Sequence, residues 1–236
     1  MSIGPNCMRT WRAAIIFLMI AGSGTISARS INWGSNLLSN LYDSNGVALS
    51  DAFKFEIGSF QTGFVPDSTN LNLWETNWKV FDHAEAPASS GWNSALRYVA
   101  SSANLTAGGT SSKSPPLPAW TFSQNEKGYM WAFNSQTYAS GVEWALITNN
   151  ASDGSPANDW LFPAPSDQSS QPLDWKISNA SAVVFGGLNN VEGAGSFSVT
   201  PGSFNLQTHQ PVPEPGSAAL MLVAAIAAGL RRRRMA

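Results

Sequence analysis

Glu56 and Glu143 are the best candidates in this chain for catalytic residues. Both lie in segments with alternating apolar residues, AFKFEIGSF and GVEWALIT, which predict strands. Glycoside hydrolysis needs two carboxyl groups about 5 to 9.5 Å apart across a sugar bond. Nothing in the spacing of the two glutamates promises that geometry, and half-buried strands commonly carry such residues on their solvent side. We therefore prefer a structural role for them over catalysis.

The other residue types offer little for nucleophilic or metal chemistry. The chain has two histidines, His83 and His209, one cysteine, Cys7, and no serine in a G-x-S-x-G elbow. Ligands at the spacing of a zinc site are missing. The loop 153–159 offers Asp and Asn oxygens for calcium, but not in the order of an EF-hand. We expect no enzyme activity, no cofactor and no metal.

Aromatic residues are the positive chemical feature of the sequence, which holds 10 Trp, 12 Phe and 4 Tyr. Each ring that enters a core buries on the order of 150–250 Å², so we expect most of them to pack inside. A ring beside loop amides can instead stack on a sugar. Five tryptophans in or beside polar, glycine- or proline-containing segments are the candidates for such a ligand patch: Trp33, Trp92, Trp120, Trp160 and Trp175.

The charge pattern argues against a nucleic-acid partner. Only 12% of the residues are charged, against a usual level of roughly 25%. The basic residues gather at the two ends, which leaves six Lys and Arg against fourteen Asp and Glu in residues 30–212, a net charge of -8. The middle of the chain is therefore an acidic region between basic ends.

Short runs of alternating apolar residues predict the elements that hold these side chains. Tyr129, Trp131 and Phe133 alternate in one run, and the alternating run 142–147 follows after the loop 134–141, which together predict a hairpin. Further short strands are predicted at 120–123, 174–177, 182–185, 195–199 and 203–206. We predict a mainly β domain over residues 29–206, a single antiparallel β-sandwich or barrel.

One segment breaks the period of two. Leu71, Trp74, Trp78 and Phe81 are spaced three, four and three residues apart, which places them on one face of a helix. We predict one short amphipathic helix over 70–82 that lies across the sheet, with His83 at its exposed end. Residues 207–212, which include His209, are predicted to be a solvated spacer.

The first 28 residues have the order of a secretory signal. Arg9 and Arg12 precede the apolar run 13–21, and small residues follow it. We predict a signal helix over 1–28 and export of the domain behind it. Because Cys7 lies before the apolar run, the exported part has no thiol and no disulfide.

The C-terminal segment 213–236 carries an ordered set of three features. Pro213, Glu214 and Pro215 precede the apolar run 216–230, which we predict to be a helix that is short for a membrane span. Four arginines follow: Arg231, Arg232, Arg233 and Arg234. This arrangement resembles the PEP-CTERM sorting tail of Gram-negative bacteria. The resemblance implies a translocon and an exosortase as partners, the second of which removes the tail. A single weak transmembrane anchor is the alternative.

The resemblance also implies a location and a role. It implies a precursor in the inner membrane and a mature protein at the cell surface or in the extracellular matrix, with a link to exopolysaccharide and biofilm. The ectodomains attached to such tails have no assigned activity that can be carried over. We expect a structural or adhesive, non-catalytic protein; a carbohydrate-binding module and a glycoside hydrolase are the alternatives.

Overall fold

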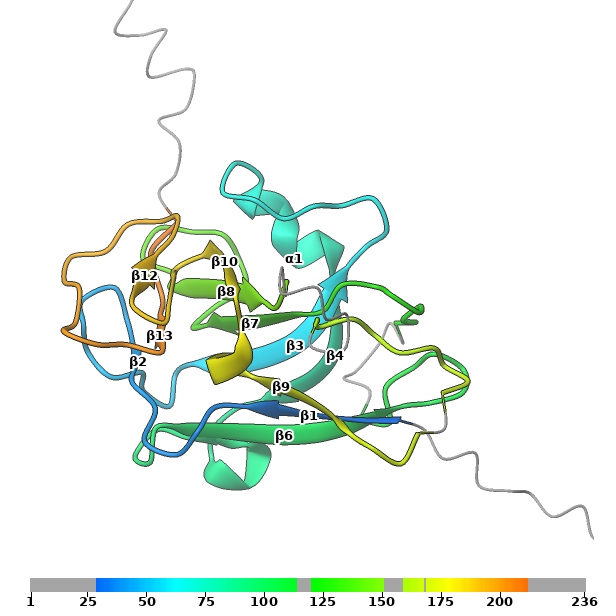
Figure 1. Cartoon of the computed structure of the whole chain (residues 1–236). Coiled ribbons are helices and arrows are strands. Elements are labelled where there is room, and N and C mark those ends of the chain that lie inside the picture. Colours follow the sequence, from blue (N-terminus) through cyan, green and yellow to red (C-terminus); the bar gives the residue numbers. More distant parts are fainter. Residues whose placement is uncertain (1–28, 114–119, 151–158, 168, 212–236) are drawn as a thin grey trace, which may run out of the picture.

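The structure is a computed structural model that describes residues 29–113, 120–150, 159–167 and 169–211 (Figure 1). The predicted signal helix, the sorting motif, the predicted tail helix with its arginines, and most of the loop 153–159 lie outside the described residues. The described part is mainly β, with three sheets and one short α-helix. No helix within it has the length and apolar character needed to cross a membrane.

The largest sheet has five strands, all antiparallel to their neighbours. The order across it is β10 (Ala182–Phe185), β8 (Trp144–Thr148), β7 (Tyr129–Phe133), β3 (Lys54–Phe60) and β4 (Trp78–Ala84). The predicted hairpin is confirmed by the pairing of β7 with β8, and the predicted strand 182–185 is β10.

Two four-stranded sheets complete the domain. One runs in the order β5 (Trp92–Asn93), β6 (Tyr98–Leu105), β1 (Arg29–Gly34) and β9 (Leu173–Lys176). The other runs β12 (Val191–Glu192), β11 (Gly187–Leu188), β13 (Leu206–Gln207) and β2 (Leu41–Tyr42). The pairs β1–β9 and β13–β2 are parallel, so the architecture is not wholly antiparallel as predicted.

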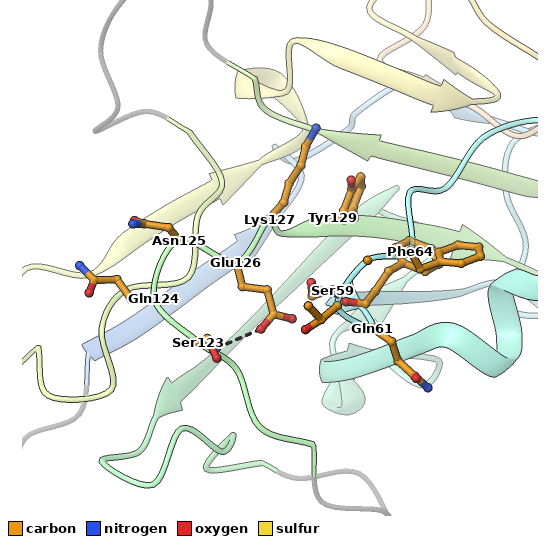
Figure 2. Close-up of a pocket in the computed structure, with 12 residues that line it drawn as sticks. Ser59, Gln61, Phe64, Ser123, Gln124, Asn125, Glu126, Lys127 and Tyr129 are labelled. Carbon is orange, nitrogen blue, oxygen red and sulfur yellow. Dashed lines mark hydrogen bonds between the residues drawn. The ribbon is translucent and has the colours of Figure 1, made fainter.

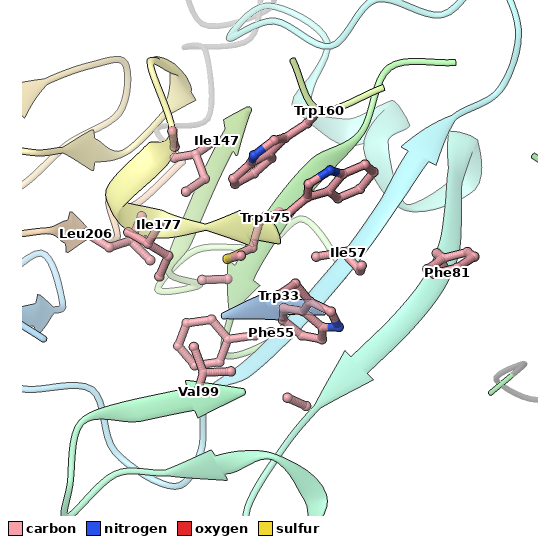
Figure 3. Close-up of a cluster of buried hydrophobic side chains, with 14 of the residues drawn as sticks. Trp33, Phe55, Ile57, Phe81, Val99, Ile147, Trp160, Trp175, Ile177 and Leu206 are labelled. Carbon is pink, nitrogen blue, oxygen red and sulfur yellow. The ribbon is translucent and has the colours of Figure 1, made fainter. Parts of the chain in front are cut away.

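The first core lies between the five-stranded sheet and the sheet of β1 (Figure 3). Phe55 and Ile57 of β3 point into it because side chains alternate along a strand. Trp33 of β1, Val99 of β6 and Trp175 of β9 meet them from the other side. Rings and branched side chains thus fill this core, as expected for a domain that the sequence leaves without disulfides.

A second core covers the opposite face of the five-stranded sheet. Trp74 of α1 (Trp74–Asn77) stacks on Trp144 at a centroid distance of 5.5 Å and meets Trp131 edge-on at 5.8 Å. The five-stranded sheet is therefore buried on both faces, and β8 is buried at every position. The remaining short helices are 3-10 turns: η1 (Leu71–Leu73), η2 (Ala88–Ser90) and η3 (Ile177–Asn179).

The predicted helix over 70–82 is wrong beyond residue 77. Only η1 and α1 are helical, and the chain turns extended at Trp78, with φ -77° and ψ 131°. Trp78 opens β4 and pairs with Phe60 of β3, while its Nε1 donates to Glu56 at 2.7 Å. Phe81 enters the first core and Trp78 the second. Strand pairing with two buried faces explains the spacing better than one helical face.

Four other predicted segments also differ. The described residues of 120–123 and 195–199 form no strand, and 203–206 contributes only the start of β13. The predicted spacer is wrong, because Gln207, Thr208 and His209 are fully buried. The backbone of His209 exchanges two hydrogen bonds with Trp144, at 2.9 and 2.8 Å. The folded domain thus extends to about residue 210.

Candidate functional site

Four of the five candidate tryptophans lie inside the domain. Trp33, Trp92, Trp160 and Trp175 are exposed by at most 2%, and only Trp120 is half-buried. The expected surface position was wrong for these four. Trp33, Trp92 and Trp175 lie on β1, β5 and β9 at positions that face the first core, and Trp160 packs in the same core. Trp160 and Trp175 stack on each other at 5.7 Å with an interplanar angle of 14°. Only Trp120 offers part of its ring to a ligand at the surface.

Glu56 and Glu143 do not face each other. Glu56 points to the side of the second core, where its Oε2 accepts from Trp78 Nε1 and Gln136 Nε2 at 2.7 and 2.8 Å. Glu143 follows the alternation of Ala145 and Ile147, which belong to the first core. The two carboxylates therefore lie on opposite faces of the sheet, and the pair lacks the geometry of a glycosidase.

The Glu143 carboxylate is saturated by the protein. It accepts from the backbone N–H and the hydroxyl of Ser44, from Thr208 Oγ1 at 2.8 Å and from Gln210 Nε2 at 3.2 Å. These donors join the β2 end, the C-terminal segment and the start of β8. Because the side chain is only 6% exposed, Glu143 has a structural role.

Asp82 carries a further carboxylate, and this one is buried. Trp33 Nε1 and Ser101 Oγ each donate to its Oδ2 at 2.7 Å, and the backbone N–H of His83 donates to Oδ1 at 2.9 Å. His83 is exposed as expected, but on a strand. Lys113 Nζ reaches Ser101 Oγ at 2.9 Å above a polar hollow of about 330 Å³. The protein's own donors occupy this carboxylate, so it has little to offer a ligand.

A more accessible hollow lies where β3 ends and β7 begins (Figure 2). Gly58 of β3 pairs with Tyr129 of β7, and this antiparallel pairing brings the segment after β3 against the segment before β7. Residues 59–64 and 123–129 then enclose about 290 Å³ of open space. We call this the first hollow.

Aromatic rings form one wall of the first hollow. Phe60 stacks on the half-buried Phe64 at 5.2 Å and meets Tyr129 edge-on at 5.4 Å. Burial raises the pKa of Tyr129 to about 12, so its hydroxyl is neutral and can donate a hydrogen bond at physiological pH. This wall therefore combines a flat apolar surface with a polar edge.

Charged and amide groups form the other wall. Glu126 pairs with Lys79 Nζ at 2.5 Å and accepts from the backbone N–H of Ser123 at 3.0 Å. Lys79 therefore compensates its charge, and the two contacts fix its position. Lys127 Nζ lies 5.3 Å from the centre of the Tyr129 ring. Burial lowers the pKa of Lys127, against the attraction of Asp159. Lys127 thus adds a cation beside the rings.

The loop that carries these groups is pinned to a neighbouring segment. Asn125 N–H donates to Phe162 O at 2.9 Å, Phe162 N–H donates to Glu126 O at 2.8 Å, and Gly128 N–H donates to Trp160 O at 2.6 Å. Asn125 adopts a φ of 63°, which asparagine tolerates better than most residues. On the other side of the hollow, Gln61 N–H donates to Asn77 O at 2.8 Å. Because backbone hydrogen bonds hold both sides, the hollow is preformed.

The arrangement suits binding better than chemistry. Its lining provides rings, amides and an ammonium group, and its one carboxylate is already paired with a lysine. The described residues contain no group of three or more His, Cys, Asp or Glu side chains that could hold a metal ion. Comparisons of this chain with known protein families, with curated proteins and with solved structures find no match.

Proposed function

We propose that this chain is an exported, non-catalytic adhesive protein that binds extracellular polysaccharide through the first hollow. We further propose that its described part is a single sandwich-like ectodomain and that the C-terminal segment is a sorting tail cut by an exosortase. The observation that carries the binding proposal is the preformed hollow, with Phe64 and Tyr129 on one wall and amide and ammonium donors on the other.

A sugar unit has the chemistry that this hollow would recognise. Its ring has apolar faces that can pack on Phe64, and its hydroxyl groups can accept from Lys127 Nζ and exchange hydrogen bonds with the Tyr129 hydroxyl. The volume of about 290 Å³ is at the small end for a ligand site, which favours one unit of a larger polymer over a large compact ligand.

The sorting proposal rests on the motif and on where the domain ends. Gln210 is still bonded to Ser196 in both directions, at 2.9 and 2.8 Å, and Pro213 follows three residues later. The motif thus begins directly behind the last residues that the domain holds. The resemblance to PEP-CTERM tails supports an exosortase as the enzyme that recognises it.

The glycosidase alternative is weaker than the binding proposal. Its two best carboxylates, Glu56 and Glu143, lie on opposite sheet faces, and each accepts hydrogen bonds from other parts of the domain. A structural role without a ligand remains the main competitor. A measurement of polysaccharide binding distinguishes this structural role from the adhesive role.

The binding test uses the full-length chain in mild detergent, mixed with exopolysaccharide from the organism that produces this protein. We expect the protein to sediment with the polymer and to release no reducing ends. Phe64→Ala should lower retention several-fold. Phe197→Ala is the control, because Phe197 is also partly exposed but lies beside His209, near the opposite end of the sheet. No retention by the parent chain would refute the binding proposal, and release of reducing ends would refute the non-catalytic one.

The sorting test is made in the native host. Replacing Pro213, Glu214 and Pro215 by alanine, or Arg231 to Arg234 by neutral residues, should leave unprocessed precursor. Mass spectrometry of the C-terminus measures this. A mature parent protein that keeps its whole tail would contradict the sorting proposal.

A further inference from the structure

The loop of the first hollow has a second hollow on its other side. Gln124 and Asn125 line both, and Figure 2 shows their side chains on the side of the loop away from Phe64. The second hollow encloses about 460 Å³ between this loop, residues 159–167 and the start of β1. The exposed pair Gln124–Asn125 therefore forms a ridge between two adjoining hollows.

The second hollow has its own polar and apolar surfaces. Arg29 Nη1 pairs with Asp167 at 2.5 Å, and Arg29 Nε donates to Gln171 O at 3.2 Å. A backbone hydrogen bond from Ser169, and after it the hydrogen bond from Arg29, hold the pKa of Asp167 below its usual value. Leu161 and Leu173 provide apolar lining beside this pair.

The ridge is rigid enough to separate two binding positions. The bond from Asn125 N–H to Phe162 O fixes its tip, and Phe162, whose N–H bonds back to Glu126, also lines the second hollow. The same backbone pairing thus shapes both hollows. A ligand that crosses the ridge meets amide groups between them, which can exchange hydrogen bonds with sugar hydroxyls.

We propose that the ligand is an extended oligosaccharide chain that crosses this ridge and fills both hollows at once. This inference rests on the proposed polysaccharide binding and adds that the binding unit is several linked sugars, not one sugar or a chain end. One part of the chain packs on Phe64 in the first hollow. A later part bonds to the Arg29–Asp167 pair in the second hollow.

Because the two hollows adjoin, affinity should depend on the length of the oligosaccharide. A short oligosaccharide fills only the first hollow, whereas a longer one adds the contacts of the ridge and the second hollow without a second loss of translational freedom. A few added hydrogen bonds correspond to a gain in affinity on the order of tenfold or more. Affinity should therefore rise with length and level off once both hollows are filled.

The test measures binding of a length series, from monosaccharide to octasaccharide, prepared by partial hydrolysis of the organism's own exopolysaccharide. Titration calorimetry with the full-length chain in detergent gives each affinity. Arg29→Gln should weaken binding of the octasaccharide about tenfold and leave the disaccharide unchanged, whereas Phe64→Ala should weaken both. Arg97→Gln is the matched control, because Arg97 is a half-buried arginine that bonds to Asn40, far from the ridge.

The outcomes separate the inference from the proposed function. Equal affinity for short and long oligosaccharides, or an octasaccharide that binds Arg29→Gln as tightly as the parent, overturns the two-hollow inference and leaves polysaccharide binding intact. No binding at any length overturns both. A melting curve checks that Arg29→Gln is folded, and Asp167→Asn, which removes the partner charge from the same hollow, serves as the second variant with the same expected result.

Discussion

Replacing Glu56 by glutamine should make the domain more stable at neutral and alkaline pH and leave it unchanged in acid. Glu56 lies beside the second core, and burial raises its pKa from 4.5 to about 7. The hydrogen bonds from Trp78 and Gln136 and the charge of Lys54 act in the opposite direction but do not cancel this effect. The folded chain therefore prefers the protonated carboxyl.

The direction of this pH dependence follows from the number of protons that the folded and the unfolded chain bind. Below pH 4.5 the Glu56 carboxyl is protonated in both the folded and the unfolded chain, so it has no effect on stability. Between pH 4.5 and 7 only the unfolded chain releases this proton, and the free energy of unfolding falls by up to about 1.4 kcal/mol per pH unit. Above pH 7 the accumulated loss is about 3 kcal/mol.

Glutamine keeps an oxygen that can accept from Trp78 and Gln136 but carries no charge. We expect Glu56→Gln to match the parent at pH 4 and to exceed its free energy of unfolding by about 3 kcal/mol at pH 8. Urea unfolding of a chain of residues 29–211, followed by tryptophan fluorescence across this pH range, measures the difference.

Glu85→Gln is the matched control on the neighbouring strand edge. Glu85 pairs with Lys54 at 2.6 Å, and the hydrogen bond from Lys54 lowers its pKa. The Glu85 charge has the opposite effect on stability. It stabilises the folded chain at pH values above the pKa of Glu85 in the unfolded chain, and this stabilisation is lost as the pH falls through the lower pKa of the folded chain. The effect should be small because the pair is exposed. A Glu56→Gln difference that does not change with pH would refute the assignment of Glu56 as a buried, destabilising charge.

Four further substitutions test the packing, each by urea unfolding. Trp74→Ala should cost about 3–5 kcal/mol, since the ring is fully buried; parent-like stability would contradict the second core. Asp82→Ala should cost about 1–3 kcal/mol by leaving the buried Trp33 Nε1 without its acceptor; no loss would refute that role. Gly34→Ala should prevent folding, because its Cβ would lie 2.0 Å from a β6 carbonyl oxygen, whereas Gly63→Ala, with nothing within 4 Å, should cost about 1 kcal/mol.

Period-two alternation predicted the strands that pair locally. The runs around Phe55, Trp131 and Trp144 became β3, β7 and β8, and the hairpin formed where its loop was expected. These predictions held because alternation depends only on neighbouring residues and on a buried face. The parallel pairs of β1 with β9 and of β13 with β2 join segments more than 130 residues apart, and local patterns carry no information about such pairings.

The helix prediction failed for a reason that the sheet explains. An amphipathic pattern identifies a helix only if one face of the element is buried. The five-stranded sheet is covered on both faces, so Trp78 and Phe81, an odd number of residues apart, enter different cores from one strand. A spacing of three is then compatible with either element, and pairing with β3 decides between them.

The first hollow could have been located only with the sheet pairing known. Its two halves belong to segments about 60 residues apart, and each looks like an ordinary polar connection in the sequence. The pairing of Gly58 with Tyr129 brings them together, and this pairing joins two strands that alternation had predicted separately. Tryptophans beside polar loops were the wrong signal, because three of the five lie on strands at positions that face the core, where a large ring buries the most area.

The buried polar residues show why composition misplaced the end of the domain. Polarity and prolines predicted that residues 207–212 are solvated, yet Thr208 and Gln210 donate to Glu143, and His209 Nδ1 lies 3.0 Å from Ala194 O. Each polar group is buried because it meets a specific partner from another segment, and such matches involve residues that are distant in sequence. The segment 208–210 is therefore held in part by hydrogen bonds to a buried carboxylate. Glu143→Gln, which weakens these acceptors without changing the shape, should loosen this segment, measured as faster amide exchange at residues 207–210, and unchanged exchange there would contradict this account.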